Sequence, residues 1–215
     1  MPAYLAKTAL YIARGSFVTI ELWALTMLCA LPLAVLLALI RVAKGHRAAK
    51  RILEIYSWIF RGTPLLLQVF FAYYGLSLIG ISLPPFAAAA LTFVINYAAY
   101  LMEIFRAGIE SIDPGQFEAA LALNMSPSLA MRRIILPQAL RRVLPPLSNE
   151  AINLVKDTAL ISVIGMADLL RAAQETAARD FSATAYCIAA ILYLAMSSLL
   201  VLLFRRLEQK AARHE

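Results

Sequence analysis

Two long stretches of the chain contain almost no charged residues, and this feature limits the possible folds more than any other. Residues 16–40 contain only Glu21, and residues 182–204 contain no Asp, Glu, Lys or Arg. Each stretch exceeds the roughly 20 residues that an α-helix needs to cross the hydrocarbon core of a bilayer. Of the 215 residues, 62% are apolar and 15% are charged, which is far from the composition of a soluble protein. The sequence therefore predicts an all-helical integral membrane protein.

Length and low charge content predict five membrane spans. The spans cover residues 16–40, 62–81, 86–105, 144–166 and 182–204. Although Lys7 and Arg14 precede the first span, its apolar core is too long for a removable signal sequence. Residues 47–60 place apolar side chains at helical spacing among charged ones, which is typical of a helix at the membrane interface. We interpret residues 1–215 as a single transmembrane domain.

Lys and Arg residues are distributed unevenly among the segments that connect these spans. Fourteen of the 20 lie in segments 41–51, 106–142 and 205–213. Cytoplasmic segments of membrane proteins carry such an excess, so we expect the N-terminus outside and the C-terminus in the cytoplasm. The same distribution explains the net charge of +7 without nucleic-acid binding, because the charges do not form one stripe. Cys29 and Cys187 lie in apolar stretches and are interpreted as packing residues.

One connection, residues 111–142, is too long and too patterned to be a simple linker. Residues 116–123 favour a short helix, and Asn124 is a suitable end for it because asparagine tolerates the left-handed conformation. Ser126 and Pro127 have the residue types of an N-cap and a first helical position, so a second helix is expected there. Two short helices at a membrane face either insert into a groove of another protein or lie on the lipid surface.

The spacing within this connection resembles the signature of permeases from ABC importers. A Glu-Ala-Ala triplet is followed, after three residues, by Asn124, where the family normally has glycine. After nine further residues comes Ile-Ile-Leu-Pro. Pro137 is expected to stop or kink the second helix. The resemblance implies that the first short helix is a coupling helix for a separate ATPase. The implied coupling residues are Glu118, Ala119, Ala120, Asn124, Ile134, Leu136 and Pro137.

Segments 60–68, 96–109 and 144–165 extend the likeness, because they resemble the polar amino acid permeases, which include histidine, glutamine, arginine and cystine importers. This resemblance implies a transport subunit, not an enzyme, in the cytoplasmic membrane. The sequence has no GxxxxGK[ST] phosphate-binding loop. ATP and Mg are therefore expected on a partner ATPase dimer. The resemblance also implies a second permease chain, identical or paralogous, and an extracytoplasmic substrate-binding protein.

Polar residues inside the spans are candidates for a substrate path, because such groups are costly in a membrane and normally face a bundle interior or a water-filled cavity. Helical geometry, about 100° per residue, places several of them on shared faces. The candidates are Gln68, Asn96, Tyr100, Glu103, Asn153, Lys156 and Asp157.

Each candidate also has a purely structural interpretation. Lys156 and Asp157 are able to form an internal ion pair, and Gln68 and Asn96 an interhelical hydrogen bond. Glu103 is able to pair with Arg106 one turn later.

Gly62, Thr63 and Pro64 form a further candidate site, a hinge or gate, because glycine adds backbone freedom and proline removes a helical hydrogen bond. The alternative is an ordinary helix start, with Thr63 as the cap and Pro64 at the first helical position.

Two other classes of membrane protein compete with this interpretation. A secondary transporter needs no ATPase, but inverted repeats and matching broken helices are expected in it, and the sequence shows neither. In a membrane enzyme we expect a nucleophile, a base and an orienting group. The two histidines, His46 and His214, lie in basic segments that offer no such set.

Overall fold

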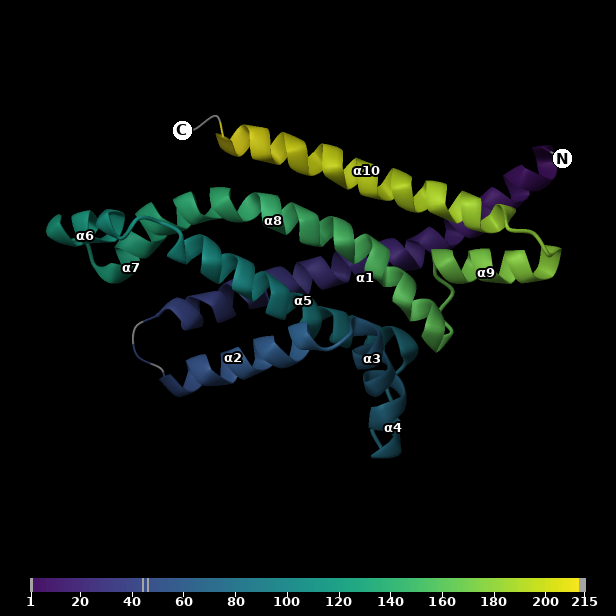
Figure 1. The fold of residues 1–215 in the computed structure, drawn as a ribbon, viewed down its shortest axis with the longest axis horizontal. Helices are drawn as coiled ribbons and strands as arrows, with labels where there is room; N and C mark the ends of the chain where they lie inside the picture. The colour runs from purple at the N-terminus through teal and green to yellow at the C-terminus, as the bar shows by residue number, and fades with distance from the viewer. Residues whose placement is uncertain (1, 44, 46, 213–215) are drawn as a thin grey trace.

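The computed structural model describes residues 2–43, 45 and 47–212, which form helices joined by short connections (Figure 1). The α-helices are α1 (Pro2–Val42), α2 (Arg47–Gly62), α3 (Leu65–Phe70), α4 (Leu76–Leu78), α5 (Pro85–Glu110), α6 (Pro114–Ala122), α7 (Pro127–Ala130), α8 (Leu136–Asp157), α9 (Leu169–Asp180) and α10 (Thr184–Ala212). Three further helical segments, η1 (Phe71–Gly75), η2 (Met131–Ile135) and η3 (Thr158–Ile164), continue the neighbouring helices. The all-helical prediction is confirmed.

Helices α1, α2, α5, α8 and α10 run along the long axis of the molecule, and α3 and α4 run across it (Figure 1). The end of α1, the start of α2, the α6–α7 pair and the end of α10 all lie at one end of the bundle, which we call the hairpin end. The start of α1 and helix α9 lie at the opposite end, which we call the far end. The three segments rich in Lys and Arg therefore share one end of the molecule.

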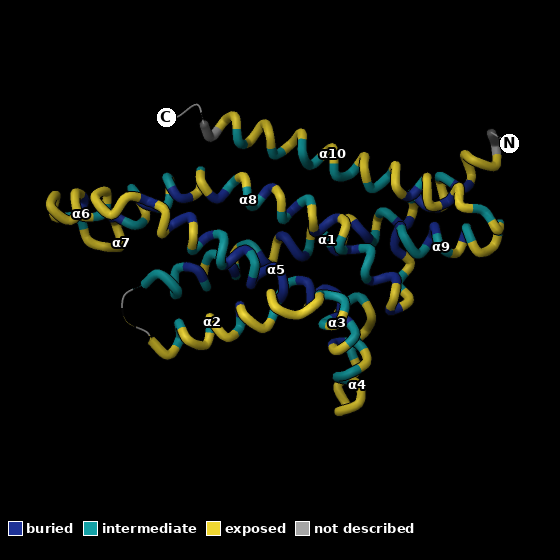
Figure 2. Tube along the Cα trace, in the orientation of Figure 1, coloured by how far each residue is buried: buried dark blue, intermediate teal, exposed yellow. Residues whose placement is uncertain are grey.

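The core forms where α1 packs along α5, and α8 adds to it (Figure 2). Ala30, Ala34 and Ala38 recur once per turn of α1 and are fully buried. Small side chains at this spacing let two helices approach closely, which is the usual way that helices pack in lipid. Helix α10, by contrast, leaves most of its apolar side chains exposed (Figure 2).

Among the residues that the structure describes, three helical stretches are long and apolar enough to cross a membrane: Tyr4–Val42, Pro85–Glu110 and Thr184–Lys210. The segment predicted as the second span, 62–81, is not one straight helix. Helix α2 ends at Gly62, α3 begins at Leu65, and the chain then changes direction (Figure 1). Pro64 causes this break, because it has no N–H to donate and disfavours the helical conformation of the residue before it.

Helix α8 is the end of a longer helical segment that begins at Pro127 and passes Pro137 without stopping. Of the two effects expected of Pro137, a stop or a kink, the stop is therefore wrong. The five residues of η2, which directly precede α8, have π-helical geometry. Such a wider turn accommodates a proline, because the ring no longer meets the carbonyl four residues earlier in the usual position.

Candidate functional site

The break between α2 and α3 is stabilised by side chains instead of by helical backbone hydrogen bonds. Pro64, with φ −62° and ψ 132°, occupies the N-cap position of α3 and supplies no side-chain cap. The Thr63 hydroxyl donates to the Ile59 carbonyl at 2.8 Å and accepts from Gln68 Nε2, also at 2.8 Å. A helix does start here, as one interpretation expected, but Thr63 does not cap it.

Gln68 and Asn96 hold the carbonyl groups that the break leaves without helical partners. Asn96 Nδ2 donates to the Phe60 carbonyl at 2.8 Å and to Gln68 Oε1 at 3.0 Å. Gln68 Nε2 lies 3.0 Å from the same Phe60 carbonyl. The predicted interhelical hydrogen bond between these two amides is therefore present, and it joins α3 to α5 at the break.

A cavity of about 650 Å³ lies beside this break, within the size range of small-molecule sites. Its walls come from the end of α2, the break, the middle of α5 and the end of α8. The lining residues are Arg61, Gly62, Thr63, Pro64, Leu65, Asn96, Tyr97, Tyr100, Glu150, Asn153, Lys156 and Asp157. The structure thus brings the predicted hinge residues and five of the predicted path residues together around one space.

The cavity lining carries two cations, Arg61 and Lys156, and two acids, Glu150 and Asp157. Asp157 accepts a hydrogen bond from the Tyr97 hydroxyl at 2.7 Å. The alternative ion pair between Lys156 and Asp157 is not among the ion pairs of the described residues, because neighbouring side chains on a helix point in different directions. Lys156 is exposed to the cavity.

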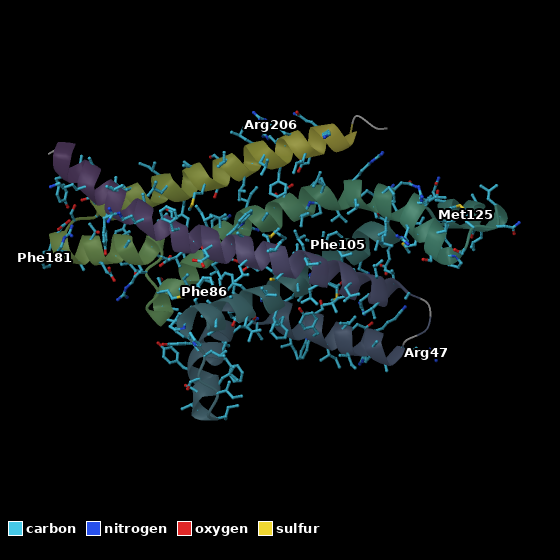
Figure 3. All side chains as sticks on the ribbon, turned by 180° about the vertical axis from the view of Figure 1, so that it is seen from behind. Arg47, Phe86, Phe105, Met125, Phe181 and Arg206 are labelled. Carbon is cyan, nitrogen blue, oxygen red and sulfur yellow. The ribbon has the colours of Figure 1, made fainter. Side chains whose placement is uncertain are left out.

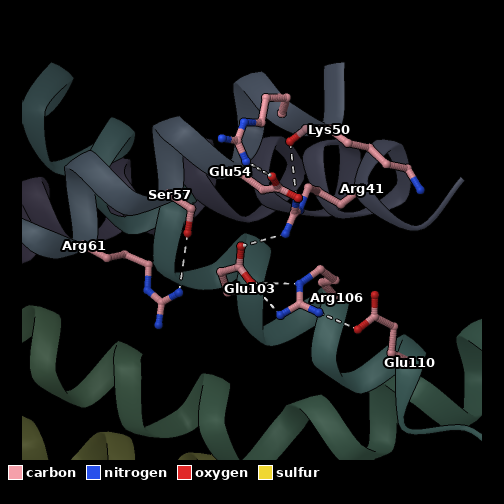
Figure 4. Close-up of polar contacts among 9 residues, drawn as sticks. Arg41, Lys50, Glu54, Ser57, Arg61, Glu103, Arg106 and Glu110 are labelled. Atoms are coloured by element: carbon pink, nitrogen blue, oxygen red, sulfur yellow. Dashed lines mark hydrogen bonds and ion pairs between the residues drawn. The ribbon is translucent and has the colours of Figure 1, made fainter. Parts of the chain in front are cut away.

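Glu103 lies outside this cavity, within a charge network near the hairpin end (Figure 4). It pairs with Arg106 at 2.7 Å, as its structural interpretation expected, and with Arg41 at 3.8 Å. Arg41 also pairs with Glu54 at 2.7 Å. A second pocket of about 390 Å³ opens beside this network. Arg41, Glu54, Ser57, Trp58, Arg61, Gly62 and Glu103 line it.

Four residues of the cavity lining belong to neither the predicted path nor the predicted hinge: Arg61, Leu65, Tyr97 and Glu150. Glu150 lies one turn before Asn153, so helical periodicity indicates it. Tyr97 is only 2% exposed and lies on the buried side of α5, and its sequence position alone does not separate it from other core aromatics. The sequence around Arg61 indicates only an ordinary interfacial arginine, because the break that places it beside the cavity is a feature of the tertiary structure.

At the hairpin end, α6 and α7 have the local structure that the sequence predicts. Asn124 adopts φ +57°, and the N–H groups of Asn124 and Met125 donate to the carbonyls of Leu121 and Ala120 at 2.9 and 3.1 Å. This pair of bonds is the Schellman pattern that ends helices. Ser126 caps the next helix by accepting from the Leu129 N–H at 3.3 Å.

The α6–α7 pair, whose loop carries Met125, protrudes from the bundle and is anchored on α5 and α8 (Figure 3). Ile109, Ile112, Ile135 and Ala139 form a buried cluster on which Phe117 of α6 packs. The predicted coupling residues divide between the two faces. Ala120 is buried, Ile134 and Leu136 are half-buried, and Glu118, Ala119, Asn124 and Pro137 are exposed. The exposed face also presents Leu121 and Leu123, at 41% and 76% exposure.

Comparison with known proteins places this architecture in a family. Residues 30–213 match the model of the binding-protein-dependent transport system inner membrane component family. The chain is 41% identical over 169 residues to the glutamine transport system permease protein GlnP of Escherichia coli, covering 77% of each chain. It is 38% identical over 205 residues to the L-cystine transport system permease protein TcyB of Bacillus subtilis, covering 94% of this chain and 87% of that protein.

Solved structures agree with these relatives. The crystal structure of an amino acid ABC transporter with histidines superposes with a TM-score of 0.90 at 35% identity, covering 97% of both chains. An inward-facing MetNI methionine ABC transporter superposes with a TM-score of 0.70 at 20% identity, which shows the shared fold alone. The resemblance found in the sequence is confirmed, and the chain is a transport subunit and not an enzyme. It belongs to the family of inner membrane components of binding-protein-dependent transport systems.

Proposed function

We propose that this chain is the permease subunit of an ATP-driven importer that carries a polar amino acid across the cytoplasmic membrane. The cavity beside the α2–α3 break is the observation that supports this proposal most strongly. Two cations and two acids line it, and a free amino acid carries one ammonium and one carboxylate group. The names of the relatives, permeases for glutamine and cystine, point to the same class of substrate.

The proposed topology has five crossings, with the N-terminus outside and the C-terminus in the cytoplasm, and residues 1–215 form one transmembrane domain. Helices α1, α5 and α10 supply three crossings, α8 with η3 supplies another, and α2 with α3 supplies the remaining one. The second crossing then begins near Arg47 instead of residue 62. The clustering of the three basic segments at the hairpin end supports a cytoplasmic hairpin end (Figure 1).

The proposed substrate path follows the polar faces of α5 and α8. Asn96, Tyr100, Asn153, Lys156 and Asp157 line the cavity. Gln68 and Glu103 do not line the cavity. Gln68 stabilises the break through its hydrogen bonds, and Glu103 lines the second pocket. Gly62, Thr63 and Pro64 form the hinge, because the helix is interrupted between Gly62 and Leu65 and all three residues line the cavity.

The proposed coupling element is the α6–α7 pair, which inserts into an ATPase dimer that binds ATP and Mg. Its exposed Glu118, Leu121 and Leu123 combine a charge with apolar contact area, which suits a protein groove. Helices α5 and α8 both run from this pair toward the middle of the bundle (Figure 1), and residues of both helices line the cavity. Movement imposed by the ATPase at one end of these two helices is therefore transmitted to the cavity.

Two further partners complete the proposed importer. A second permease subunit, identical or paralogous, provides the other half of the path. An extracytoplasmic substrate-binding protein delivers the amino acid at the far end, where α9 lies.

Reconstitution of the purified complex tests this proposal. The chain, expressed with its candidate ATPase, is extracted in mild detergent and placed in liposomes with candidate binding proteins loaded with glutamine, arginine, histidine or cystine. We expect the ATPase to co-purify and at least one loaded binding protein to stimulate ATP hydrolysis. Uptake driven by an ion gradient with no ATPase present would instead indicate a secondary transporter.

A further inference from the structure

Two pockets lie on either side of a single arginine. Arg61 and Gly62 line both the cavity of about 650 Å³ and the pocket of about 390 Å³. The smaller pocket, which we call the hairpin-side pocket, lies nearer the hairpin end. Arg41 belongs to the last turn of α1, and Glu103 comes three residues after Tyr100 along α5 toward that end. The two spaces are therefore consecutive along the bundle axis, and Arg61 stands where they meet.

Weak contacts hold the Arg61 side chain in this position. Its guanidinium carbon lies 5.4 Å from the centre of the Tyr100 ring, which is a cation–π contact. Its Nη1 donates to Ser57 Oγ at 3.4 Å, which is long for a hydrogen bond (Figure 4). In the described part of the chain, no carboxylate lies within ion-pair distance of Arg61.

The backbone beneath this side chain is held more firmly, through the preceding residue. The Phe60 carbonyl accepts from Asn96 Nδ2 at 2.8 Å, and the Tyr100 hydroxyl makes a longer contact, 3.3 Å, with the Arg61 carbonyl. The Arg61 guanidinium is thus loosely held, whereas the backbone that carries it is fixed by hydrogen bonds. Both lie directly before the break between α2 and α3. Acids lie on both of its sides, Glu150 in the cavity and Glu103 in the hairpin-side pocket.

We propose that the Arg61 side chain is the gate between the cavity and the hairpin-side pocket, and that this pocket is the exit route of the amino acid. In the closed position the guanidinium lies on the Tyr100 ring. It opens the route by leaving the ring, with acids available on either side to receive it. This inference deepens the proposed function and rests on it, since it assigns a direction of travel to the same path.

Cysteine accessibility tests the gate directly. Cys29 and Cys187 are replaced by serine, and Asn153→Cys provides one thiol in the cavity. Inside-out vesicles expose the hairpin end to a cationic, membrane-impermeant methanethiosulfonate reagent, with no nucleotide and no amino acid present. We expect Arg61→Ala to raise the modification rate about five- to tenfold, the factor that a lost cation–π contact supports. Arg61→Lys, which keeps a cation beside the ring, is the matched control and is expected to remain slow.

A second pair of variants keeps the test decisive if Arg61→Ala fails to fold. Tyr100→Leu removes the ring and is expected to accelerate modification, whereas Tyr100→Phe keeps the ring and is not. Equal rates for Arg61→Ala and the parent, at equal abundance, would overturn the gate, as would equal rates for Tyr100→Leu and Tyr100→Phe. Because the readout needs neither ATP hydrolysis nor uptake, a negative result here leaves the proposed function standing.

Discussion

The hydrogen bond between Tyr97 and Asp157 offers the clearest quantitative test of the cavity. The Tyr97 ring is 2% exposed, and its hydroxyl donates to Asp157 Oδ2 at 2.7 Å. Phenylalanine has the same ring, so Tyr97→Phe removes this one bond and leaves no void beyond the hydroxyl. The bond also joins α5 to α8, the two helices that connect the hairpin to the cavity.

The expected loss of stability follows from the environment of the acceptor. A hydrogen bond to a charged group contributes about 1.5–3 kcal/mol net. Asp157 is half-buried and borders the cavity. Water is therefore able to replace part of the hydrogen bond that the Tyr97 hydroxyl donated, and the low end of that range applies. For a chain of this size, a loss of about 1.5 kcal/mol lowers Tm by about 3–6 °C.

Thermal unfolding of the detergent-purified protein measures this change. We expect Tyr97→Phe and Asp157→Asn each to lower Tm, and the double variant to lose less than the sum, because both single changes remove the same bond. Tyr100→Phe is the control, since its hydroxyl makes a longer bond to a backbone carbonyl. An unchanged Tm in Tyr97→Phe, or strictly additive losses in the double variant, would refute the reasoning.

Three further predictions concern coupling, packing and transport. Glu118→Arg is expected to abolish ATP-driven uptake while membrane abundance stays normal, because it reverses a charge on the exposed face of α6; normal uptake would contradict the coupling assignment. Gly15→Ala places a Cβ 2.6 Å from the Asp168 carbonyl oxygen, so we expect a loss of about 1–3 kcal/mol, seen as a lower Tm in detergent; an unchanged Tm would show that α1 and α9 separate easily. Lys156→Met is expected to reduce uptake more than abundance, since Lys156 is exposed in the cavity and has no ion-pair partner among the described residues; equal reductions would indicate a structural role.

The sequence alone determined the class of the protein and the local structure of its hairpin. Long stretches almost without charge exclude water as the solvent for those parts of the chain, whatever the helices pack against. The left-handed Asn124 and the Ser126 cap were equally predictable, because each depends on hydrogen bonds to residues within five positions. The family resemblance came from the same local spacing.

Tertiary structure alone decided which polar side chains share a space. Asp157 accepts a hydrogen bond from Tyr97, sixty positions away, instead of pairing with its neighbour Lys156. Asn96 donates a hydrogen bond to Gln68, which is 28 positions away. The break at Pro64 turns α3 aside, and this turn places Arg61 between two pockets. Helical periodicity states which residues share a face of one helix, but the partner across the interface depends on how separate helices pack. That packing arises from the summed contacts of the whole bundle, so no short stretch of sequence contains it.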